Sequence, residues 1–476
     1  MTPARVRPLF LSRARGRIAG ALILALAFVL PPSAVARDWI VSIEGHDDSG
    51  DGTVARPFRT LGRALNPSSG AQDGDTVMLR GIPGANVYEE CAARLRFRLT
   101  LRSYPGEAAH IRCPLKVEDS VLVLDREASG STISDLELSG SAYYAVKFNT
   151  DWSPGEEGAN RGTSNVVLEN LRIHDTGRDG IKITPKCDHI TIRRSEIWNT
   201  GAGYPPGTPQ AKKNADGIDN VNGSNMIVED NYIHDIATTG LYFKGGAKDV
   251  LVQRNRIERT GSGGIRVGFD TDEDAFDTKV NPGFYESIGA VVRNNYVSDT
   301  PYAGIALYGA KDATIVNNTI VDAAKTGQAA LYFGITIDER SAEAGRPSSV
   351  NPKIERNLVL QRGGACVDIA WRIHENGKQF IKILRWKIPL ISALQGSPGT
   401  DRNLYYDTSG RCRFIDRRKV LSTMSFEEWQ GREPADRDSS EMPFAIDEST
   451  GRLRDAEGSS SGIGVLELPN RTRAMP

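Results

Sequence analysis

The sequence predicts an all-β chain whose short parallel strands stack as the turns of one solenoid, a parallel β-helix. Three observations predict it: a phrase that recurs through residues 165–360, period-2 alternation of apolar residues inside each copy, and an asparagine at the same place in most copies. A strand pattern without helical periodicity leaves no room for a crossover helix between parallel strands. Successive copies must therefore bury their apolar faces against one another.

Each copy of the repeat is a β-branched run, a polar turn, a glycine and a second apolar run. The seven copies are VVLENLRIHDTGRDGIKI, ITIRRSEIWNTG, MIVEDNYIHDIATTGLYF, VLVQRNRIERTGSGGIRV, VVRNNYVSDTPYAGIAL, ATIVNNTIVDAAKTGQAALYF and PKIERNLVLQRGGACVDI. Their anchor residues are Asn170, Ser195, Asn231, Asn255, Asn295, Asn318 and Asn357. Spacings of 23 to 25 residues mark bare coils and longer spacings mark insertions. We expect the asparagine amides to form a hydrogen-bonded ladder inside one corner of the coils.

The ends of the chain differ from the repeat. Residues 1–36 have five arginines, an apolar run and Ala34-Val35-Ala36, the pattern of a secretory signal cleaved after Ala36. We expect residues 37–115 to hold an N-terminal cap and the first coils, 116–370 the repeats, and 371–476 degenerate final coils and a C-terminal cap, loosely ordered from Gly431. Capping is required because an uncovered coil exposes unpaired backbone groups.

Composition limits the classes of function. Lysine and arginine total 59 against 60 acids, so no basic surface for nucleic acid is expected. No apolar run reaches the ~18 residues of a membrane helix. The sequence therefore predicts a monomer, secreted or periplasmic, without a membrane span.

The five cysteines include no C-x-x-C pair of the kind that holds zinc. Cys91 and Cys113 lie 22 residues apart, about one coil, so they either stack and form a disulfide or remain two unpaired buried thiols.

Aligning the second apolar runs predicts which residues point outward. The alignment uses Gly180, Gly217, Gly240, Gly264, Gly304 and Ala330. The next residue and the third after each are apolar and should face the core, among them Ile181, Ile218, Leu241, Ile265 and Ile305. The second and fourth should face outward, and they include Lys182, Asp219, Tyr242, Lys244, Arg266, Tyr308 and Tyr332. Three insertions, at 203–214, 269–287 and 336–350, should lie beside this face.

One segment resembles a known signature. Residues 214–219, Asn-Ala-Asp-Gly-Ile-Asp, are similar to the Asn-Thr-Asp-Gly-Ile-Asp of polygalacturonases, which hydrolyse pectin with three carboxylates. Where that family continues with an Asp-Asp pair, this chain has Thr238-Thr239, so only Asp216 has a counterpart. With the repeat, the segment makes the chain similar to the pectate-lyase-like right-handed parallel β-helix superfamily, which implies a right-handed coil.

The polysaccharide lyases of this superfamily imply a second set of roles. Lys244 and Arg266 resemble the Lys and Arg pair of alginate- and chondroitin-cleaving lyases, which implies that Lys244 is the base and Arg266 neutralises or donates. Asp216 and Asp219 are similar to the aspartates that hold calcium in some pectate lyases. The outward Lys182, Tyr242, Tyr308 and Tyr332 are then candidate substrate contacts.

A second candidate calcium site is the acidic run at the start of the longest insertion. Asp270, Asp272 and Asp274 alternate with other residues, and Asp277 follows. Calcium takes six to eight oxygen ligands, so alternating carboxylates suit it. The same run is typical of an ordinary solvated acidic loop. His174 and His234, each in an Ile-His-Asp sequence, are interpreted as turn residues rather than ligands.

Two classes of function follow. The first is a lyase that cleaves a uronate-containing, anionic polysaccharide, with calcium as cofactor. The second is a carbohydrate-binding or surface β-helix without catalysis, because the fold alone implies no activity. Glycoside hydrolysis or uronate epimerisation on the same face is a third possibility.

Overall fold

The computed structural model describes residues 36–69, 71–151, 161–336, 347–373, 390–419, 422–454 and 463–465. Residues from Ala36 onward form one compact unit. The predicted signal sequence lies outside the described residues except for Ala36. Part of the third insertion, 337–346, also lies outside them.

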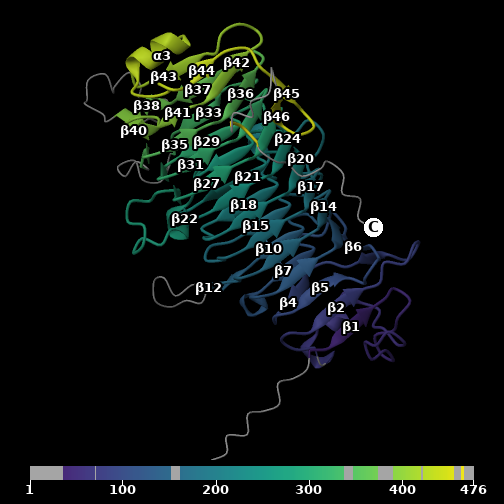
Figure 1. Cartoon of the computed structure of the whole chain (residues 1–476). Coiled ribbons are helices and arrows are strands. Elements are labelled where there is room, and N and C mark those ends of the chain that lie inside the picture. The colour runs from purple at the N-terminus through teal and green to yellow at the C-terminus, as the bar shows by residue number, and fades with distance from the viewer. Residues whose placement is uncertain are drawn as a thin grey trace, which may run out of the picture. The chain divides into compact units, whose positions relative to one another are not determined.

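The described chain is a stack of coils, and each coil visits three parallel sheets in turn (Figure 1). Sheet 1 contains β1 (Asp38–Val41), β2 (Thr76–Leu79), β5 (Thr100–Ser103), β8 (Thr132–Ser134), β13 (Val167–Glu169), β16 (Thr191–Arg193), β19 (Ile227–Glu229), β23 (Leu251–Gln253), β27 (Val291–Arg293), β31 (Thr314–Val316), β35 (Lys353–Glu355) and β41 (Thr400–Asp401).

Sheet 2 follows sheet 1 in each coil. It contains β3 (Val87–Glu89), β6 (Ala109–Cys113), β9 (Leu136–Gly140), β14 (Arg172–His174), β17 (Glu196–Trp198), β20 (Tyr232–Ile236), β24 (Arg256–Thr260), β28 (Tyr296–Ser298), β32 (Thr319–Val321), β36 (Leu358–Gln361), β42 (Leu404–Asp407) and β44 (Ser440–Glu441).

Sheet 3 completes the coil and carries the second apolar runs of the repeat. It contains β4 (Ala93–Leu95), β7 (Leu122–Leu124), β10 (Val146–Phe148), β15 (Ile181–Ile183), β18 (Ile218–Val221), β21 (Leu241–Lys244), β25 (Ile265–Val267), β29 (Ile305–Tyr308), β33 (Ala329–Gly334), β37 (Ala365–Ile369) and β43 (Phe414–Asp416). The all-β, right-handed parallel β-helix predicted from the repeat is confirmed.

Shorter elements complete the described chain. A small parallel sheet holds β22 (Ala247–Lys248), β26 (Ser287–Ile288), β30 (Ala310–Lys311), β34 (Ser349–Val350) and β40 (Leu394–Gln395). Three hairpins are β11 (Thr150–Asp151) with β12 (Arg161–Gly162), β38 (Trp371–Ile373) with β39 (Leu390–Ser392), and β45 (Ala445–Asp447) with β46 (Arg452–Arg454). The helices are α1 (Leu61–Ala64), α3 (Phe426–Arg432) and the 3-10 turns η1 (Pro67–Ser69), η2 (Arg126–Ala128), η3 (Gln210–Lys212) and η4 (Glu273–Ala275).

The predicted register of sheet 3 is confirmed. Neighbouring strands pair the aliphatic residues directly with one another, in the order Ile181, Ile218, Leu241, Ile265 and Ile305. All five are buried in the main core. A slip of one residue would have turned each of them outward.

The asparagine ladder forms between sheets 1 and 2. Each amide donates to the side-chain oxygen of the next asparagine at 3.0 Å, along Asn231, Asn255, Asn295, Asn318, Asn357 and Asn403. Each also donates to a buried backbone carbonyl of the coil before. Ser195 begins the ladder, since its backbone N–H donates to Asn231. Asn403, within a final coil, was not foreseen.

The prediction for Asn170 was wrong by one residue. Leu171 occupies the ladder position, because its backbone N–H donates to the Ser195 hydroxyl. Asn170 instead has a φ of 52° and donates to Asp135. Asparagine is favoured at such left-handed turn positions, so it marks the turn before the ladder.

A strand and a short helix lie at the N-terminal end of the coils. Strand β1 pairs with β2, and the short helix α1, capped by Thr60, contacts β1 and β4. Trp39 stacks on Phe58 with ring centroids 5.8 Å apart. These contacts cover the first coil.

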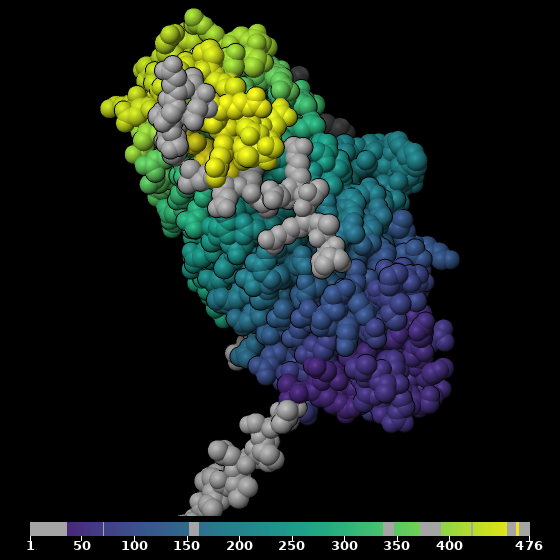
Figure 2. Space-filling model, turned by 45° about the vertical axis from the view of Figure 1, so that its right-hand side comes forward, coloured from purple at the N-terminus to yellow at the C-terminus, as the bar shows by residue number. Residues whose placement is uncertain are grey.

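The described residues between Gly431 and Arg454 make more contacts than the sequence suggested. Asp436, expected in a loose segment, is fully buried and accepts hydrogen bonds from Thr400, Tyr405 and Trp429. Helix α3 begins with a capping box of Ser425 and Glu428. Further along, Ile446 of β45 packs on apolar residues of sheet 2, and Figure 2 shows this yellow segment against the green coils. These contacts are made by residues without a repeat, which is why composition missed them.

Two disulfides form among the described cysteines. Cys91 bonds Cys113, which decides between the two alternatives, and Cys366 bonds Cys412, a pair the spacing did not suggest. Cys187 is free and buried. Burial raises the pKa of its thiol to about 11, so it stays protonated.

Among the described residues, no helix has the length and apolar character needed to cross a membrane.

The ladder generates a stability prediction. Asn295→Ala removes the oxygen that accepts from Asn255 and the amide that donates to Val252, so buried polar groups lose their partners. We expect a loss of roughly 2–4 kcal/mol in the free energy of unfolding, measured by chemical denaturation. The control is Asn170→Gly, which keeps the left-handed turn and should change stability by less than about 1 kcal/mol. Equal losses in both variants would contradict the ladder assignment.

Candidate active site on the outward face of sheet 3

Three aspartates meet where two strands of sheet 3 begin. Asp179 and Asp216 lie two residues before β15 and β18, and Asp219 is the second residue of β18. One carboxylate oxygen of each lies within 4.8 Å of those of the other two. All three side chains belong to residues that are at most 3% exposed. We call them the carboxylate cluster.

Glycines bring the first two aspartates together. A Cβ on Gly180 would lie 2.7 Å from the backbone oxygen of Gly217, and one on Gly217 would collide with the oxygen of Gly240. Only glycine therefore allows these coils to approach so closely. The Gly180 N–H donates to the Asp216 carbonyl at 2.9 Å, which stacks the two aspartates on consecutive coils.

The hydrogen bonds of the cluster leave two oxygens unused. Oδ1 of Asp216 accepts from the Thr238 hydroxyl at 2.6 Å and the Thr239 N–H at 2.7 Å. Oδ1 of Asp179 accepts from the Asp216 N–H at 2.8 Å. Within the described part of the chain, Oδ2 of Asp179 and Oδ1 of Asp219 are buried without a hydrogen-bond partner. Such oxygens require a proton, an ion or a ligand.

Burial and mutual repulsion act on these carboxyls. Burial raises the pKa of Asp179 well above its usual value, and the charges of Asp219 and Asp216 raise it further. Burial followed by the charge of Asp219 raises the pKa of Asp216, although the hydrogen bond from Thr238 opposes this. Three carboxylates this close cannot all carry a charge without a compensating cation.

Lys182 supplies one positive charge to the cluster. Its ammonium forms a close ion pair with Oδ2 of Asp219. Burial would lower the pKa of Lys182, but the charges of Asp219 and Asp179 outweigh burial and raise it. Lys182, interpreted from sequence as a substrate contact, is thus a permanently charged partner of Asp219.

A row of aromatic rings continues along the same face. Tyr242 and Phe269 have ring centroids 6.1 Å apart, Phe269 and Tyr308 5.4 Å, and Tyr308 and Tyr332 6.0 Å. Gly334 makes room for Tyr308, because any Cβ there would overlap the tyrosine ring. Tyr242 is buried, and burial followed by the charge of Asp219 raises the pKa of its hydroxyl well above the usual value.

The two predicted catalytic cations flank this row. Lys244 Nζ lies 4.9 Å from the centroid of Tyr242 and 5.6 Å from that of Phe269, and it donates to the Asp270 carbonyl at 2.7 Å. The Arg266 guanidinium lies 4.3 Å from the Phe269 centroid and donates to Ser262 at 2.6 Å. Both side chains are half-buried. Among the described residues, Lys244 pairs with no carboxylate, in contrast to Lys182.

The structure gathers most of the residues selected from sequence onto one face. Asp219, Tyr242 and Arg266 lie opposite one another on three consecutive strands, as their alignment predicted. Asp179 was missed as a site residue. The resemblance to polygalacturonases placed a partner carboxylate for Asp216 one coil later, at Thr238-Thr239. The partner is instead Asp179, in the coil before. Asp179 could have been selected from the sequence because the same Asp-Gly dipeptide precedes β15 and β18.

The acidic loop is arranged differently. Asp270, Asp272 and Asp274 are not among the groups of three whose ligand atoms come within 4.8 Å in the described chain. Asp272 and Asp274 lie at η4, and Asp277 pairs with Lys186 at 2.6 Å, which ties the insertion to the coil of β15. Calcium binding by this loop stays a prediction.

A shallow pocket of about 440 Å³ lies near the far end of β15. Its lining includes three cations, Arg126, Arg161 and Lys186. Lys186 also holds the insertion through Asp277. The pocket lies in the turn that leaves sheet 3 toward sheet 1.

Comparisons with known proteins agree with the fold. The family described as "Right handed beta helix region" matches residues 119–272 and 159–332. The complex structure of XylC with xylose is similar, with 12% identity, a TM-score of 0.50, and coverage of 86% of this chain and 88% of that one. No curated protein matches the chain.

Other similar structures are more distant. Pectate lyase Pel9A has 13% identity and a TM-score of 0.46 over 70% of this chain and 76% of its own. The A-module of the mannuronan C-5 epimerase AlgE4 of Azotobacter vinelandii has 16% identity and a TM-score of 0.47 over 80% and 93%.

The coil order and the matched region define a right-handed parallel β-helix. The fold is thereby shown for the described chain, and the family match covers residues 119–332 of it.

The carboxylate cluster predicts an unusual dependence of stability on pH. A carboxyl whose pKa is raised on folding costs nothing below the unfolded value of 3.8, and it destabilises the fold as pH rises from there through the folded value. With chelator present, we expect stability to fall as pH rises above about 4, by about 1.4 kcal/mol for each unit by which folding raises the pKa. Chemical denaturation across this range measures it.

Asp179→Asn should flatten that profile, because an amide does not ionise. Asp299→Asn removes the same charge from an exposed residue and should leave the profile unchanged. An unchanged slope in Asp179→Asn would show that the cluster does not titrate in this way.

Proposed function

We propose that the protein is an exported enzyme that cleaves a uronate-containing polysaccharide by β-elimination on the outward face of sheet 3. One observation carries the proposal. Lys244 and Arg266 approach Phe269 beside a buried carboxylate cluster that has two unused acceptor oxygens. Cations, aromatic rings and acidic groups are thereby available to one anionic sugar chain.

Each group has a role in this reaction. Arg266 binds the uronate carboxylate and neutralises it, which acidifies the neighbouring C–H. Lys244, as the neutral amine, removes that proton. The electron pair forms a carbon–carbon double bond as the glycosidic C–O bond breaks, and the departing oxygen takes a proton from solvent or from the ammonium. Tyr332 and Phe269, half-exposed in the aromatic row, contact the sugar rings.

Calcium fits the carboxylate cluster. The donors are all carboxylate oxygens, two of them without a partner in the described chain, and three negative charges face the single ammonium of Lys182. One divalent cation would balance the remainder. Asp179, Asp216 and Asp219 would hold the ion, which would supply positive charge to this face.

The geometry favours elimination over hydrolysis. Glycosidases place their two carboxyl groups about 5–5.5 Å or about 6.5–9.5 Å apart, with a sugar or water between them. All three side chains of the cluster belong to residues at most 3% exposed, so a sugar and a water have little access between them. The three carboxylates are better suited to sharing a proton or an ion.

The two disulfides and the leader pattern of residues 1–36 support export to an oxidising compartment. We expect the protein to act as a monomer.

The test is ultraviolet absorbance of unsaturated uronate on alginate, pectin and glycosaminoglycans. Wild type should produce it on one of these, and Lys244→Ala should lower kcat/KM by about 10²–10⁴-fold. Lys248→Ala, a half-buried lysine in the same coil, should stay within about threefold of wild type. Activity retained in Lys244→Ala would remove the base assignment.

The products also separate the alternative functions. Binding without turnover would favour a carbohydrate-binding protein. A changed sugar configuration without unsaturated product would favour epimerisation, which uses the same proton abstraction.

A further inference from the structure

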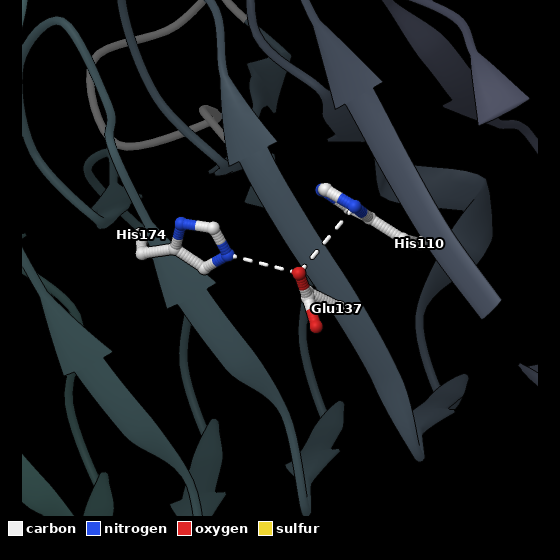
Figure 3. Close-up of side chains that lie close together, drawn as sticks. All are labelled: His110, Glu137 and His174. Atoms are coloured by element: carbon white, nitrogen blue, oxygen red, sulfur yellow. Dashed lines mark hydrogen bonds and ion pairs between the residues drawn. The ribbon is translucent and has the colours of Figure 1, made fainter. Parts of the chain in front are cut away.

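A second cluster lies on a different sheet. His110 of β6, Glu137 of β9 and His174 of β14 come from three consecutive strands of sheet 2 and point outward (Figure 3). His110 pairs directly with Glu137 across the strands, and His174 lies opposite Ser139, two residues beyond Glu137. The fixed register therefore brings two imidazoles to one carboxylate.

The distances suit a metal ion. Oε1 of Glu137 lies 3.1 Å from Nε2 of His174 and 3.4 Å from Nδ1 of His110. All three atoms lie within 4.8 Å of one another. In a tetrahedral zinc site with ligands at about 2.0–2.1 Å, ligand atoms are separated by about 3.4 Å. The observed separations are close to that value.

In each of the three side chains, the nitrogen or oxygen that faces away from the cluster is already hydrogen-bonded. Nδ1 of His174 bonds the Asp175 carboxylate at 2.8 Å, and Nε2 of His110 bonds the Ser139 hydroxyl at 2.7 Å. Oε2 of Glu137 accepts from Arg172 at 2.8 Å. Metal-binding histidines are oriented in this way, with the outer nitrogen on a carboxylate or hydroxyl and the inner one toward the ion. The ring of His174 also stacks on Trp198, with centroids 4.3 Å apart.

The chain contains a similar His–Glu–Asp arrangement that lacks the third ligand. Nε2 of His234 lies 3.2 Å from Oε1 of Glu196, and Nδ1 lies 2.6 Å from Asp235. His110 lies opposite Glu137 on the neighbouring strand, whereas Arg172 lies opposite Glu196. A guanidinium cannot ligate a metal. The second arrangement is therefore a His–Glu ion pair without the third ligand.

We propose that His110, Glu137 and His174 bind a divalent transition-metal ion, zinc foremost. Two imidazoles and one carboxylate are a ligand set used for zinc, and three protein ligands leave a coordination position for water or another ligand. Both histidine side chains are 12% exposed and that of Glu137 23%, so solvent reaches the site. The ion would tie three coils together on sheet 2, independently of the chemistry proposed for sheet 3.

The test uses the full chain, stripped with chelator and titrated with Zn²⁺ by calorimetry at pH 8. Co²⁺ replaces zinc in a second titration, because its visible spectrum reports tetrahedral coordination. With Ca²⁺ kept in the buffer to occupy the carboxylate cluster, we expect one equivalent of Zn²⁺ to bind. His110→Gln and His174→Ala should each weaken binding by at least about 100-fold, and Asp175→Asn by about 10–100-fold.

His234→Ala is the matched control, because it removes a histidine that pairs in the same way with the equivalent carboxylates, Glu196 and Asp235. It should bind Zn²⁺ within about threefold of wild type, and circular dichroism should show all variants folded. The proposal is overturned if wild type binds no equivalent of Zn²⁺, if binding survives in both His110→Gln and His174→Ala, or if His234→Ala loses it to the same extent.

Discussion

The fixed register of the parallel backbone hydrogen bonds between coils is the constraint on which the rest of the molecule depends. The glycine column of sheet 3 and the asparagine ladder at the other side of the core hold this register from two places. The register determines which side chains are neighbours on each outward face. Asp219, Tyr242 and Arg266 are neighbours because their strands pair in this register. A one-residue slip would bury the charged residues and expose the aliphatic ones.

The parts that could be predicted from sequence are those that repeat. An aliphatic residue of sheet 3 and, from Asn231 to Asn357, an asparagine of the ladder occur in successive coils. The copies within one sequence can therefore be aligned with one another. Asn170 shows where this fails. In Asn294-Asn295, the first residue has the left-handed turn conformation and the second is a member of the ladder. A single asparagine in the sequence therefore fits either role. Only the pairing of backbones distinguishes them.

The rest depended on contacts that no repeat encodes. The Asp-Gly before β15 looks like an ordinary turn, and the burial that makes Asp179 part of a site comes from the neighbouring coils. Cys366 and Cys412 are separated by 46 residues that include an insertion, so their spacing carries no signal. The residues around Asp436 belong to a single irregular cap. In each case the determining partner is distant in sequence and occurs once.

The two outward faces show how one backbone serves different chemistry. On sheet 2, Glu137, Arg172 and Glu196 alternate in charge along three paired strands, and such cross-strand pairs contribute about 0.2–1 kcal/mol each. On sheet 3, like charges are instead concentrated in a buried cluster. The first arrangement stabilises the stack, whereas the second costs stability and is tolerated because the surrounding register is rigid.

The asparagine ladder has a direction, and this determines how it can end. Every amide donates to the side-chain oxygen of the asparagine in the next coil, and the last, Asn403, donates to Asp436 at 3.3 Å. A carboxylate only accepts hydrogen bonds, so it has nothing to pass to a further coil. Asp436 is thus the last acceptor of the asparagine ladder. In the described chain the ladder therefore ends at a buried carboxylate whose oxygens already accept from Thr400, Tyr405 and Trp429.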